Sequence, residues 1–292
     1  MKNTALKLAS VAVSAAILSA CGGGSGSSDG SPSSDPSPPA ATAPVTAGVF
    51  KGTITSSATT TQPVSVIAMT GPDGHSTWMS ADGRVWSGHV PQTGSHFDAS
   101  FSGHMYDGLH FPDGTNHGTW TMTVDHRATG MTGQFNGGGD AGSFAMNLSP
   151  MWNRTGSLSE AAGVYMRTTS SGYAMEMTIS SNGQMSGHDT RGCVFSGTVT
   201  VPDAAHNLYR LEASVSSCGA LDGAYTGMGT LVDADAMRDW MTSMHPLEHG
   251  GHSHGGSMGG GMMGNTVPTG TRNLFMFCLA NPTNAIMDSL AK

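Results

Sequence analysis

The sequence has 292 residues, a formal net charge of −8 at pH 7 and a charged fraction of only 11%. Lys and Arg together number 12, which is too few to form the cationic surface that follows a phosphate backbone, and this excludes a nucleic-acid-binding protein. The scarcity of Glu, Lys and Leu excludes a coiled coil, and a hydrophobic content of 37% excludes a fully disordered chain.

Residues 1–20 have the organisation of a secretory signal peptide. Lys2 and Lys7 form a positive region before an apolar run over residues 8–18, which is too short to span a bilayer. The run ends in Leu18-Ser19-Ala20-Cys21, which resembles the lipobox of bacterial lipoproteins. The resemblance implies that Cys21 becomes the first residue of the mature chain and carries a diacylglyceryl group, so that acyl chains anchor the protein in a lipid bilayer. It also implies sorting to the outer membrane, because Gly22 rather than Asp follows the cysteine.

The next residues, 22–46, are mostly Gly, Ser, Pro and Ala, a composition that cannot bury a core. We therefore expect residues 21–46 to be a lipidated cysteine followed by a disordered tether. Beyond the signal peptide no apolar stretch reaches 18 residues, so the sequence predicts no further membrane-spanning helix.

From Ala47 onward, apolar residues alternate with polar ones, as Trp120, Met122 and Val124 do. Alternation with a period of two indicates strands with one buried face. Asp-Gly and Asn-Gly dipeptides, which tolerate the positive φ of tight hairpins, separate the alternating segments. Many short strands at this spacing predict antiparallel barrels or sandwiches. The clearest segments are residues 64–68, 97–101, 120–124, 144–148, 173–179 and 209–215, and the dipeptides begin at Asp73, Asp82, Asp113, Asn182 and Asp222.

Three segments recur, which indicates an internal duplication. Residues 47–50 recur as 162–165, residues 82–89 as 182–188, and residues 143–148 as 273–279. We therefore expect an all-β fold of two antiparallel β-barrel or β-sandwich-like units. The first unit covers residues 47–150, and the second covers 158–292 with an insertion at 233–270 that contains one short helix. Whether the two units form one barrel or two stays open.

Methionine is frequent in the predicted strands, where its flexible thioether can fill uneven space in a core. We expect these methionines to be buried, and we expect the thiol of Cys278, which lies in an apolar strand, to be buried with them. The methionines in question are Met146, Met175, Met177 and Met276.

Two other cysteines flank a predicted hairpin. Cys193 begins one strand and Cys218 ends the next. If the strands pair without a bulge, the numbers of facing residues sum to 411, so that Val201 faces Arg210 and Cys193 faces Cys218. Cysteines in that register are within disulfide reach, and the cell envelope is an oxidising compartment. The sequence therefore predicts a disulfide between Cys193 and Cys218.

The insertion concentrates metal-binding side chains. It opens with apolar residues at helical spacing, from Met237 to Met244, which predicts a short helix after Asp233. A glycine-rich stretch with interspersed His and Met follows. Thioether sulfur prefers Cu(I), and imidazole binds Cu, Zn and Ni. His252 and His254 can chelate one ion from an extended loop. The expected ligands are His245, His249, His252, His254, Met241, Met244, Met258, Met262 and Met263.

The composition of this segment is similar to the Met- and His-rich tracts of periplasmic copper-handling proteins, and the similarity implies copper as the metal. We expect no obligatory cofactor. A low-complexity loop without a physiological metal stays open as the alternative. The sequence lacks the fixed Cys/His spacing of a structural zinc site. Most histidines of the first unit are expected at the surface; they are His75, His89, His96, His104, His110, His117 and His126.

No motif predicts catalysis. Residues 251–255 match G-x-S-x-G, but that motif functions only at the strand-to-helix turn of an α/β-hydrolase. The chain has neither HExxH nor a usable phosphate-binding loop. We therefore expect a protein that is not an enzyme.

A wider pattern includes Gly192-Cys193-Val194-Phe195-Ser196-Gly197 and, further along, Asp222-Gly223-Ala224-Tyr225-Thr226-Gly227. It resembles uncharacterised proteobacterial lipoproteins with a lipobox and duplicated all-β units. The resemblance implies a surface or periplasmic lipoprotein of unassigned activity and transfers no catalytic residue.

Together these observations predict a non-enzymatic outer-membrane lipoprotein that binds copper or another transition metal through the insertion. Two alternatives stay open. One is a carrier that holds a small apolar ligand in a β cavity lined by Trp78, Trp86 and Phe97. The other is a surface lipoprotein that binds a protein partner through exposed strands and has no metal role.

Overall fold

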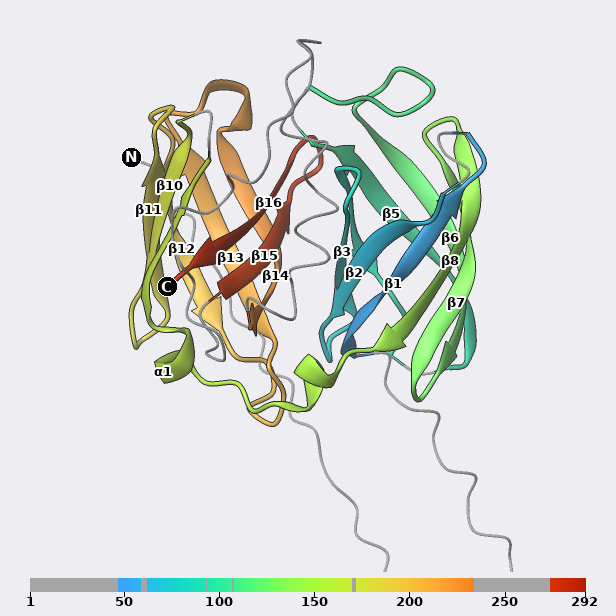
Figure 1. Cartoon of the computed structure of the whole chain (residues 1–292), viewed down its shortest axis with the longest axis horizontal. Helices are drawn as coiled ribbons and strands as arrows, with labels where there is room; N and C mark the ends of the chain where they lie inside the picture. The colour runs from blue at the N-terminus through green and yellow to red at the C-terminus, as the bar shows by residue number, and fades with distance from the viewer. Residues whose placement is uncertain (1–46, 59–61, 93, 107, 170–171, 234–273) are drawn as a thin grey trace, which may run out of the picture. The chain divides into compact units, whose positions relative to one another are not determined.

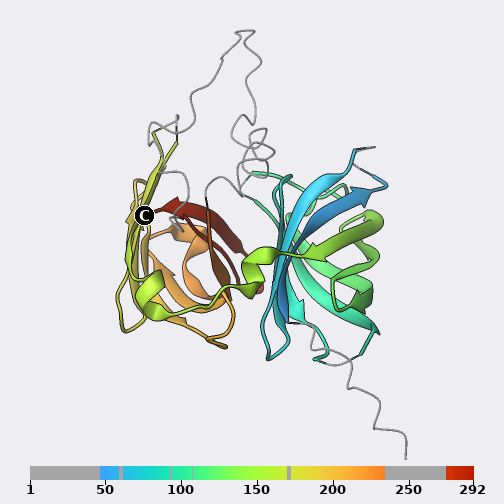
Figure 2. The ribbon, with the colours of Figure 1, turned by 60° about the horizontal axis from the view of Figure 1, so that its bottom comes forward.

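The structure is a computed structural model that describes residues 47–292 except 59–61, 93, 107, 170–171 and 234–273 (Figure 1). The described residues all belong to one compact unit. This unit contains two closed antiparallel barrels of eight strands, which confirms the predicted all-β fold and decides for two barrels. Figure 2 shows the strands of each barrel winding around their own interior.

In both barrels every strand pairs with the next one along the chain. The first barrel consists of β1 (Gly48–Ser56), β2 (Val64–Thr70), β3 (His75–Ser80), β4 (Arg84–His89), β5 (His96–Met105), β6 (His117–Arg127), β7 (Gly130–Gly137) and β8 (Asp140–Leu148). The second consists of β9 (Gly163–Thr168), β10 (Ala174–Ile179), β11 (Gln184–Asp189), β12 (Val194–Thr200), β13 (Tyr209–Ser216), β14 (Gly223–Val232), β15 (Leu274–Ala280) and β16 (Ala285–Ala291).

Short helical segments lie outside the barrel walls. A 3₁₀ turn at Pro150–Asn153 and the helix α1 at Leu158–Ala161 connect the barrels, and a second 3₁₀ turn at Gly219–Leu221 precedes β14. The Ser157 side chain caps α1 by accepting a hydrogen bond from the Glu160 amide. The helix predicted after Asp233 lies outside the described residues, so α1 is a different helix from the one that the sequence predicts.

Two hairpin turns, one in each barrel, share one local chemistry. At the β3–β4 turn, the Ser80 hydroxyl donates to Asp82 at 2.5 Å and the Gly83 amide donates to the Ser80 carbonyl at 3.1 Å. At the β10–β11 turn, Ser180, Asn182 and Gly183 make the equivalent bonds at 2.5 and 2.9 Å. Both glycines have a φ near +85°, a conformation that costs glycine little.

This shared turn explains one of the sequence echoes and corrects its interpretation. The turn of residues 82–89 joins the third and fourth strands of its barrel, whereas that of 182–188 joins the second and third. Residues 143–148 lie in the last strand of the first barrel, but the described part of their echo, residues 274–279, lies in the next-to-last strand of the second. Only residues 47–50 and 162–165 occupy equivalent places, at the start of the first strands. Two of the echoes therefore reflect recurring local patterns and do not align the barrels strand by strand.

The predicted register of the β12–β13 hairpin is wrong by one residue. Thr200, and not Val201, faces Arg210, so that facing numbers sum to 410. By that register Cys193 would face Ser217, yet its sulfur is bonded to Cys218, with Cα atoms 4.5 Å apart. Ser217 has a φ of +59°, which turns the chain after β13 and brings Cys218 round to Cys193. The cysteine pair is the predicted one, but an extra left-handed residue brings the two together.

Aromatic rings fill the first barrel. Trp120 is fully buried, and its ring lies 5.6 Å from that of Trp86 and 5.1 Å from that of Phe111. The ring of Trp78 packs edge-on against Phe144 at 5.0 Å. Edge-to-face and tilted arrangements at these separations are favourable for aromatic pairs. The interior of this barrel is therefore a packed core.

One ion pair is buried inside the first barrel. Arg84 on β4 and Asp140 on β8 are 2.8 Å apart, with side chains 3% and 0% exposed. Asp140 also accepts hydrogen bonds from the Ser56 hydroxyl at 2.6 Å and from the Ala58 amide at 3.1 Å. A buried charge pair is tolerated only when its remaining hydrogen-bonding capacity is met, and these bonds meet that of the carboxylate.

Aliphatic residues, methionine and tyrosine dominate the core of the second barrel, where Met175 and Met177 are buried as predicted. The hydroxyl of the buried Tyr165 donates to the Ala161 carbonyl at 2.7 Å, which attaches α1 to the barrel. The predictions for the other methionines and the free thiol are also confirmed, because Met146, Met276 and Cys278 are at most 2% exposed.

Some strands are buried on both faces. All residues of β3 and β15 are buried, as are the last five of β2. Outward-facing residues of both barrels belong to one apolar cluster, in which Ile67 and Met79 of the first barrel join Met228 and Met276 of the second. The side chains of Trp152 and His206 stack beside this cluster, with ring centroids 3.8 Å apart. The sequence of β15 is therefore apolar throughout because the strand is buried on both faces, one toward the core of its own barrel and one toward the cluster between the barrels.

Candidate functional site

The predicted metal ligands lie outside the described residues. This holds for His245, His249, His252, His254, Met241, Met244, Met258, Met262 and Met263, and also for the lipidation site Cys21. The structure therefore says nothing of their arrangement. It does describe the two strands from which the insertion departs.

The base of the insertion is a paired hairpin. Val232 at the end of β14 faces Leu274 at the start of β15, and both are buried. Next to Val232, the carboxylate of Asp233 lies 2.5 Å from the Arg154 guanidinium. The buried Asn207 side chain makes two hydrogen bonds to the backbone of Leu231 on β14. It donates to the Leu231 carbonyl at 2.6 Å and accepts from the Leu231 amide at 3.2 Å. Ladder pairing therefore holds the two ends of the insertion together, and the ion pair and the Asn207 hydrogen bonds fix the end that leaves β14.

A small cavity lies at the opposite end of the second barrel. The turns β9–β10, β11–β12, β13–β14 and β15–β16 meet there, and Tyr173, Arg191, Leu221 and Asn284 line the cavity from these four turns. Tyr106 and Leu109, from the β5–β6 connection, line it from the first barrel. Its volume is about 110 Å³, enough for about three or four water molecules. We call this cavity the barrel mouth.

Paired charges surround the barrel mouth. Arg191 lies 3.0 Å from Asp189, and its guanidinium carbon is 5.0 Å from the ring centre of Tyr173, a cation–π distance. Across the seam of the barrel, Arg167 lies 2.6 Å from Asp288. Burial, followed by the charge of Asp288, raises the pKa of Tyr173 above its ordinary value, so this phenol stays protonated at neutral pH.

His104 is the unusual residue of the barrel mouth. It lies on β5, is 1% exposed, and neither ring nitrogen has a hydrogen-bond partner within the described residues. Burial, followed by repulsion from His117 on β6, lowers the pKa of His104 to about 4, although the nearby Thr283 backbone opposes this shift. The imidazole is therefore neutral at pH 7. No sequence signal predicts this burial, because His104 projects outward from its own barrel and is covered by the other one.

Most histidines of the first unit lie at the surface, as expected. His89, His96, His110 and His117 are exposed, whereas His75, His104 and His126 are buried. Burial lowers the pKa of each of the three buried histidines. Within the described residues, His, Cys, Asp and Glu form no group of three or more that could hold a metal ion.

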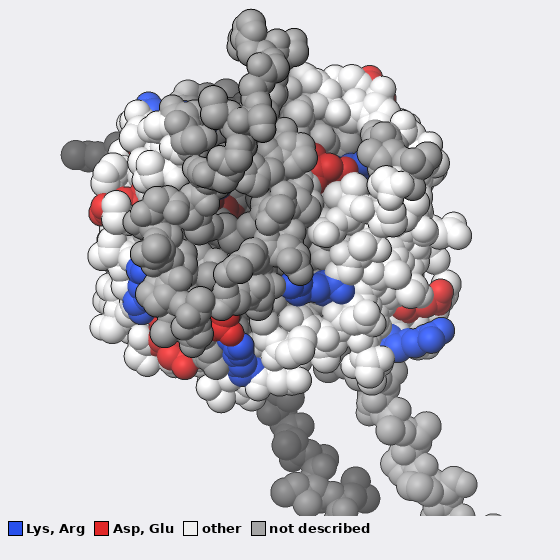
Figure 3. Space-filling view, viewed as in Figure 1, with Lys and Arg blue, Asp and Glu red and all other residues white. Residues whose placement is uncertain are grey.

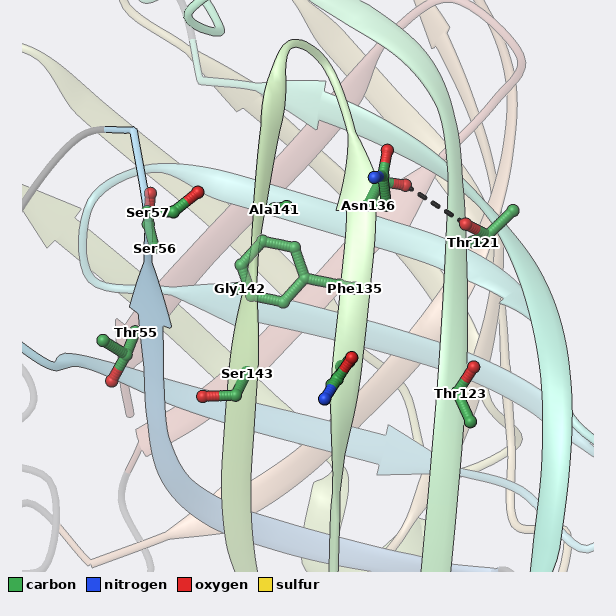
Figure 4. A pocket seen from close by; sticks show the side chains of 11 residues that line it. Thr55, Ser56, Ser57, Thr121, Thr123, Phe135, Asn136, Ala141, Gly142 and Ser143 are labelled. Atoms are coloured by element: carbon green, nitrogen blue, oxygen red, sulfur yellow. Dashed lines mark hydrogen bonds between the residues drawn. The ribbon is translucent and has the colours of Figure 1, made fainter.

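A second hollow, of about 500 Å³, lies on the outer face of the first barrel (Figure 4). Thr123, Gln134, Ser143 and Thr55 face one another across four neighbouring strands, β6, β7, β8 and β1. The lining contains hydroxyl and amide groups and no titratable side chain, so it offers neutral hydrogen bonding without acid–base chemistry. Figure 3 shows few charges on the face in view, and they do not gather into one patch.

No helix among the described residues is long and apolar enough to cross a membrane. Comparisons of the chain with protein-family models, with curated proteins and with solved structures find no match. What the chain can do must therefore be inferred from its own residues: an insertion held at its base, a small barrel mouth with a buried imidazole, and a neutral polar hollow.

Proposed function

We propose that this protein is a non-enzymatic, lipid-anchored protein of the outer membrane that binds copper or a similar transition metal through the insertion at 233–270. The observation that carries the proposal is the pairing of Val232 with Leu274 at the base of an insertion rich in soft ligands. The second barrel holds the two ends of the insertion close together at Val232 and Leu274, which lowers the entropy lost when distant His and Met side chains converge on one ion.

The choice of metal follows from the ligand types. The nine predicted ligands are imidazoles and thioethers, which favour Cu(I) and, through His, Cu(II). Neutral ligands release few protons on binding, so affinity persists at mildly acidic pH until histidine is protonated. A lipid anchor at Cys21 holds the barrels outside the cytoplasm, where this ligand set can meet exogenous metal.

Carriage of an apolar ligand has less support. Trp78 and Trp86 belong to the packed aromatic core of the first barrel, at 2% and 1% exposure, and so do not line an open cavity. Binding of a protein partner is the second candidate. The observation that favours it is a pair of large apolar side chains on β9, Val164 and Met166, which are 49% and 47% exposed.

Metal titration of the mature chain, produced from residue 22 onward, tests the proposal. A matched full-length variant, the insertion variant, carries His→Asn at the four predicted histidines and Met→Leu at the five predicted methionines. We expect the mature chain to bind Cu(I), measured by competition with a chromophoric chelator in ascorbate, and the insertion variant to bind at least one equivalent less. Equal stoichiometry and affinity in both would refute the proposed function.

Lipidation is tested separately. Mass spectrometry of the native protein should find the N-terminal peptide beginning at an acylated Cys21, and a Cys21→Ser substitution should leave the chain unprocessed and without diacylglycerol. Recovery of unacylated native protein from the cytoplasm would overturn the anchoring proposal.

A further inference from the structure

The neutral polar hollow on the outer face of the first barrel follows a strand with small side chains (Figure 4). β8 lines it with residues 141–143, which are Ala, Gly and Ser. The neighbouring strands carry longer side chains, Gln134 and Asn136 on β7 and Thr55 on β1. Because the side chains of β8 are shorter than those on either side, β8 forms the floor of the hollow.

Several polar side chains of the hollow are not engaged by the protein. Ser143 faces Gln134 on one side and Thr55 on the other, and none of these three side chains makes a hydrogen bond to another described residue. The Thr123 hydroxyl, which extends the row beyond Gln134, donates to Asp98 at 2.8 Å and keeps its lone pairs as acceptors. Hydroxyl and primary amide groups both donate and accept hydrogen bonds. The row therefore presents donors and acceptors together to the solvent.

The chemistry of the lining excludes several classes of ligand. It contains no Lys, Arg, His, Asp or Glu, so nothing in it balances the charge of a phosphate, a carboxylate or a metal ion. The strands β6, β7, β8 and β1 each pair along both edges, so this wall offers no free backbone edge to an extended peptide. Among the described residues, the large exposed apolar side chains lie in the second barrel, so an apolar partner would find no anchor here. The remaining class is a neutral ligand rich in hydroxyl and amide groups.

The extent of the hollow fits a ligand of several linked units. Strands lie about 4.8 Å apart, so the row from Thr123 to Thr55 is about 14 Å long. A second row, from Thr121 through Asn136 to Ala141, lies two residues further along the strands, about 7 Å away. The hollow has a volume of about 500 Å³. An oligosaccharide laid across the strands can direct hydroxyl groups toward both rows, whereas a single sugar would leave most of the lining unused.

We propose that the neutral polar hollow binds a neutral glycan, which lies across β6, β7, β8 and β1 and exchanges hydrogen bonds with Thr123, Gln134, Ser143 and Thr55. No ion pair takes part, so the affinity should depend little on salt. Glycoside hydrolysis ordinarily requires a pair of carboxyl groups, which the lining lacks, so the glycan is bound and not cleaved. The inference goes beyond the proposed function and shares no residue with the metal-binding insertion.

The mature chain, prepared without metal, is tested on an array of neutral oligosaccharides built from glucose, galactose, mannose or N-acetylglucosamine, with sulfated and uronic-acid glycans beside them. Saturation-transfer NMR at millimolar glycan detects weak binding in solution. We expect at least one neutral oligosaccharide to bind, with an affinity that changes less than twofold when the salt concentration is raised tenfold. Binding to none of the neutral glycans, or only to the charged ones, refutes the inference.

Two matched double variants locate the site. Thr55→Val and Thr121→Val remove one hydroxyl from each side of the hollow and keep the size of the side chains. Thr53→Val and Thr132→Val make the same change at exposed threonines on β1 and β7 that do not line the hollow. All four positions are exposed and valine favours strands, so both variants should fold with the urea midpoint of the mature chain. We expect the first pair to weaken glycan binding at least tenfold and the second to change it less than twofold. An equal loss in both variants, or no loss in the first, overturns the assignment.

Discussion

The two barrels have the same strand order but are closed by different means. In the first, β1 and β8 meet along seven register pairs, from Phe50 opposite Leu148 to Ser56 opposite Gly142. In the second, β9 and β16 share one register pair, Met166 opposite Ala291. Side chains supplement that seam, where Arg167 on β9 pairs with Asp288 on β16. The comparison shows that one topology can be closed mainly by backbone hydrogen bonds or largely by side-chain interactions.

The interiors of the two barrels also differ in the side chains that fill them. The first barrel packs rigid aromatic rings, and the tight fit depends on glycine: a Cβ atom at Gly103 would lie 2.3 Å from the Trp120 ring. The described core of the second barrel has no tryptophan and is richer in Leu, Ile and Val, and this barrel carries a disulfide between two of its hairpin turns. We therefore expect the first barrel to be sensitive to changes in its core and the second to depend on its side-chain and covalent links.

The largest expected effect is loss of the buried ion pair in the first barrel. Asp140→Ala removes the fully buried partner of Arg84 and leaves the partly exposed Asp82, 3.1 Å away, to balance the charge; loss of one partner of a buried ion pair typically costs about 3 to 5 kcal/mol of stability. Urea unfolding followed by tryptophan fluorescence measures it, because Trp78, Trp86 and Trp120 all lie in this barrel. The control Asp125→Ala removes an exposed carboxylate paired with exposed His96 and should change little. Similar midpoints for the two variants would contradict the role given to Asp140.

The next effect concerns the second barrel. Replacing Cys193 and Cys218 by Ala removes a crosslink between residues 25 apart and should cost about 3 kcal/mol through the entropy of loop closure. Hydrogen exchange of the β12 and β13 amides should accelerate, while the amides of the first barrel keep their rates. Wild-type protein treated with a reductant should reproduce the change. Exchange that accelerates equally in both barrels would show that they unfold together.

The smallest expected effect is a difference in acid sensitivity. Burial lowers the pKa of His126 below its ordinary 6.5, so that below this pH the unfolded chain binds more protons than the folded one. The stability of the first barrel should therefore fall as the pH drops below 6.5. In the described part of the second barrel no histidine is buried, so its stability should vary less over this range.

A variant isolates the contribution of His126. Its ring packs edge-on against Phe50, so His126→Phe retains an aromatic ring while removing the titration. The pH dependence of the urea midpoint, followed by tryptophan fluorescence, should become shallower in this variant. An unchanged slope would assign the acid sensitivity to His75 and His104, which are also buried.

Much of the fold was predictable because its signals are local. The alternation from Trp120 to Val124 indicates a strand without reference to any other part of the chain. The Asp82-Gly83 turn is closed by hydrogen bonds among residues within five positions of one another. The metal binding expected of the insertion stays a prediction, because its ligands lie outside the described residues. The barrel mouth could not be predicted, because its lining residues come from five separate connections and from strands of both barrels.

By itself the sequence determined the all-β class, the two units, the hairpin turns and the cysteine pair, because alternation, turn dipeptides and cysteine positions act over a few residues. Only the tertiary structure decided that the units are two separate barrels, that Ser217 offsets the hairpin register, and that β3 and β15 are buried on both faces. The burial of His104 is likewise seen only in the tertiary structure. Burial of an outward-facing side chain depends on which surface packs against it, and that surface belongs to residues distant in the chain.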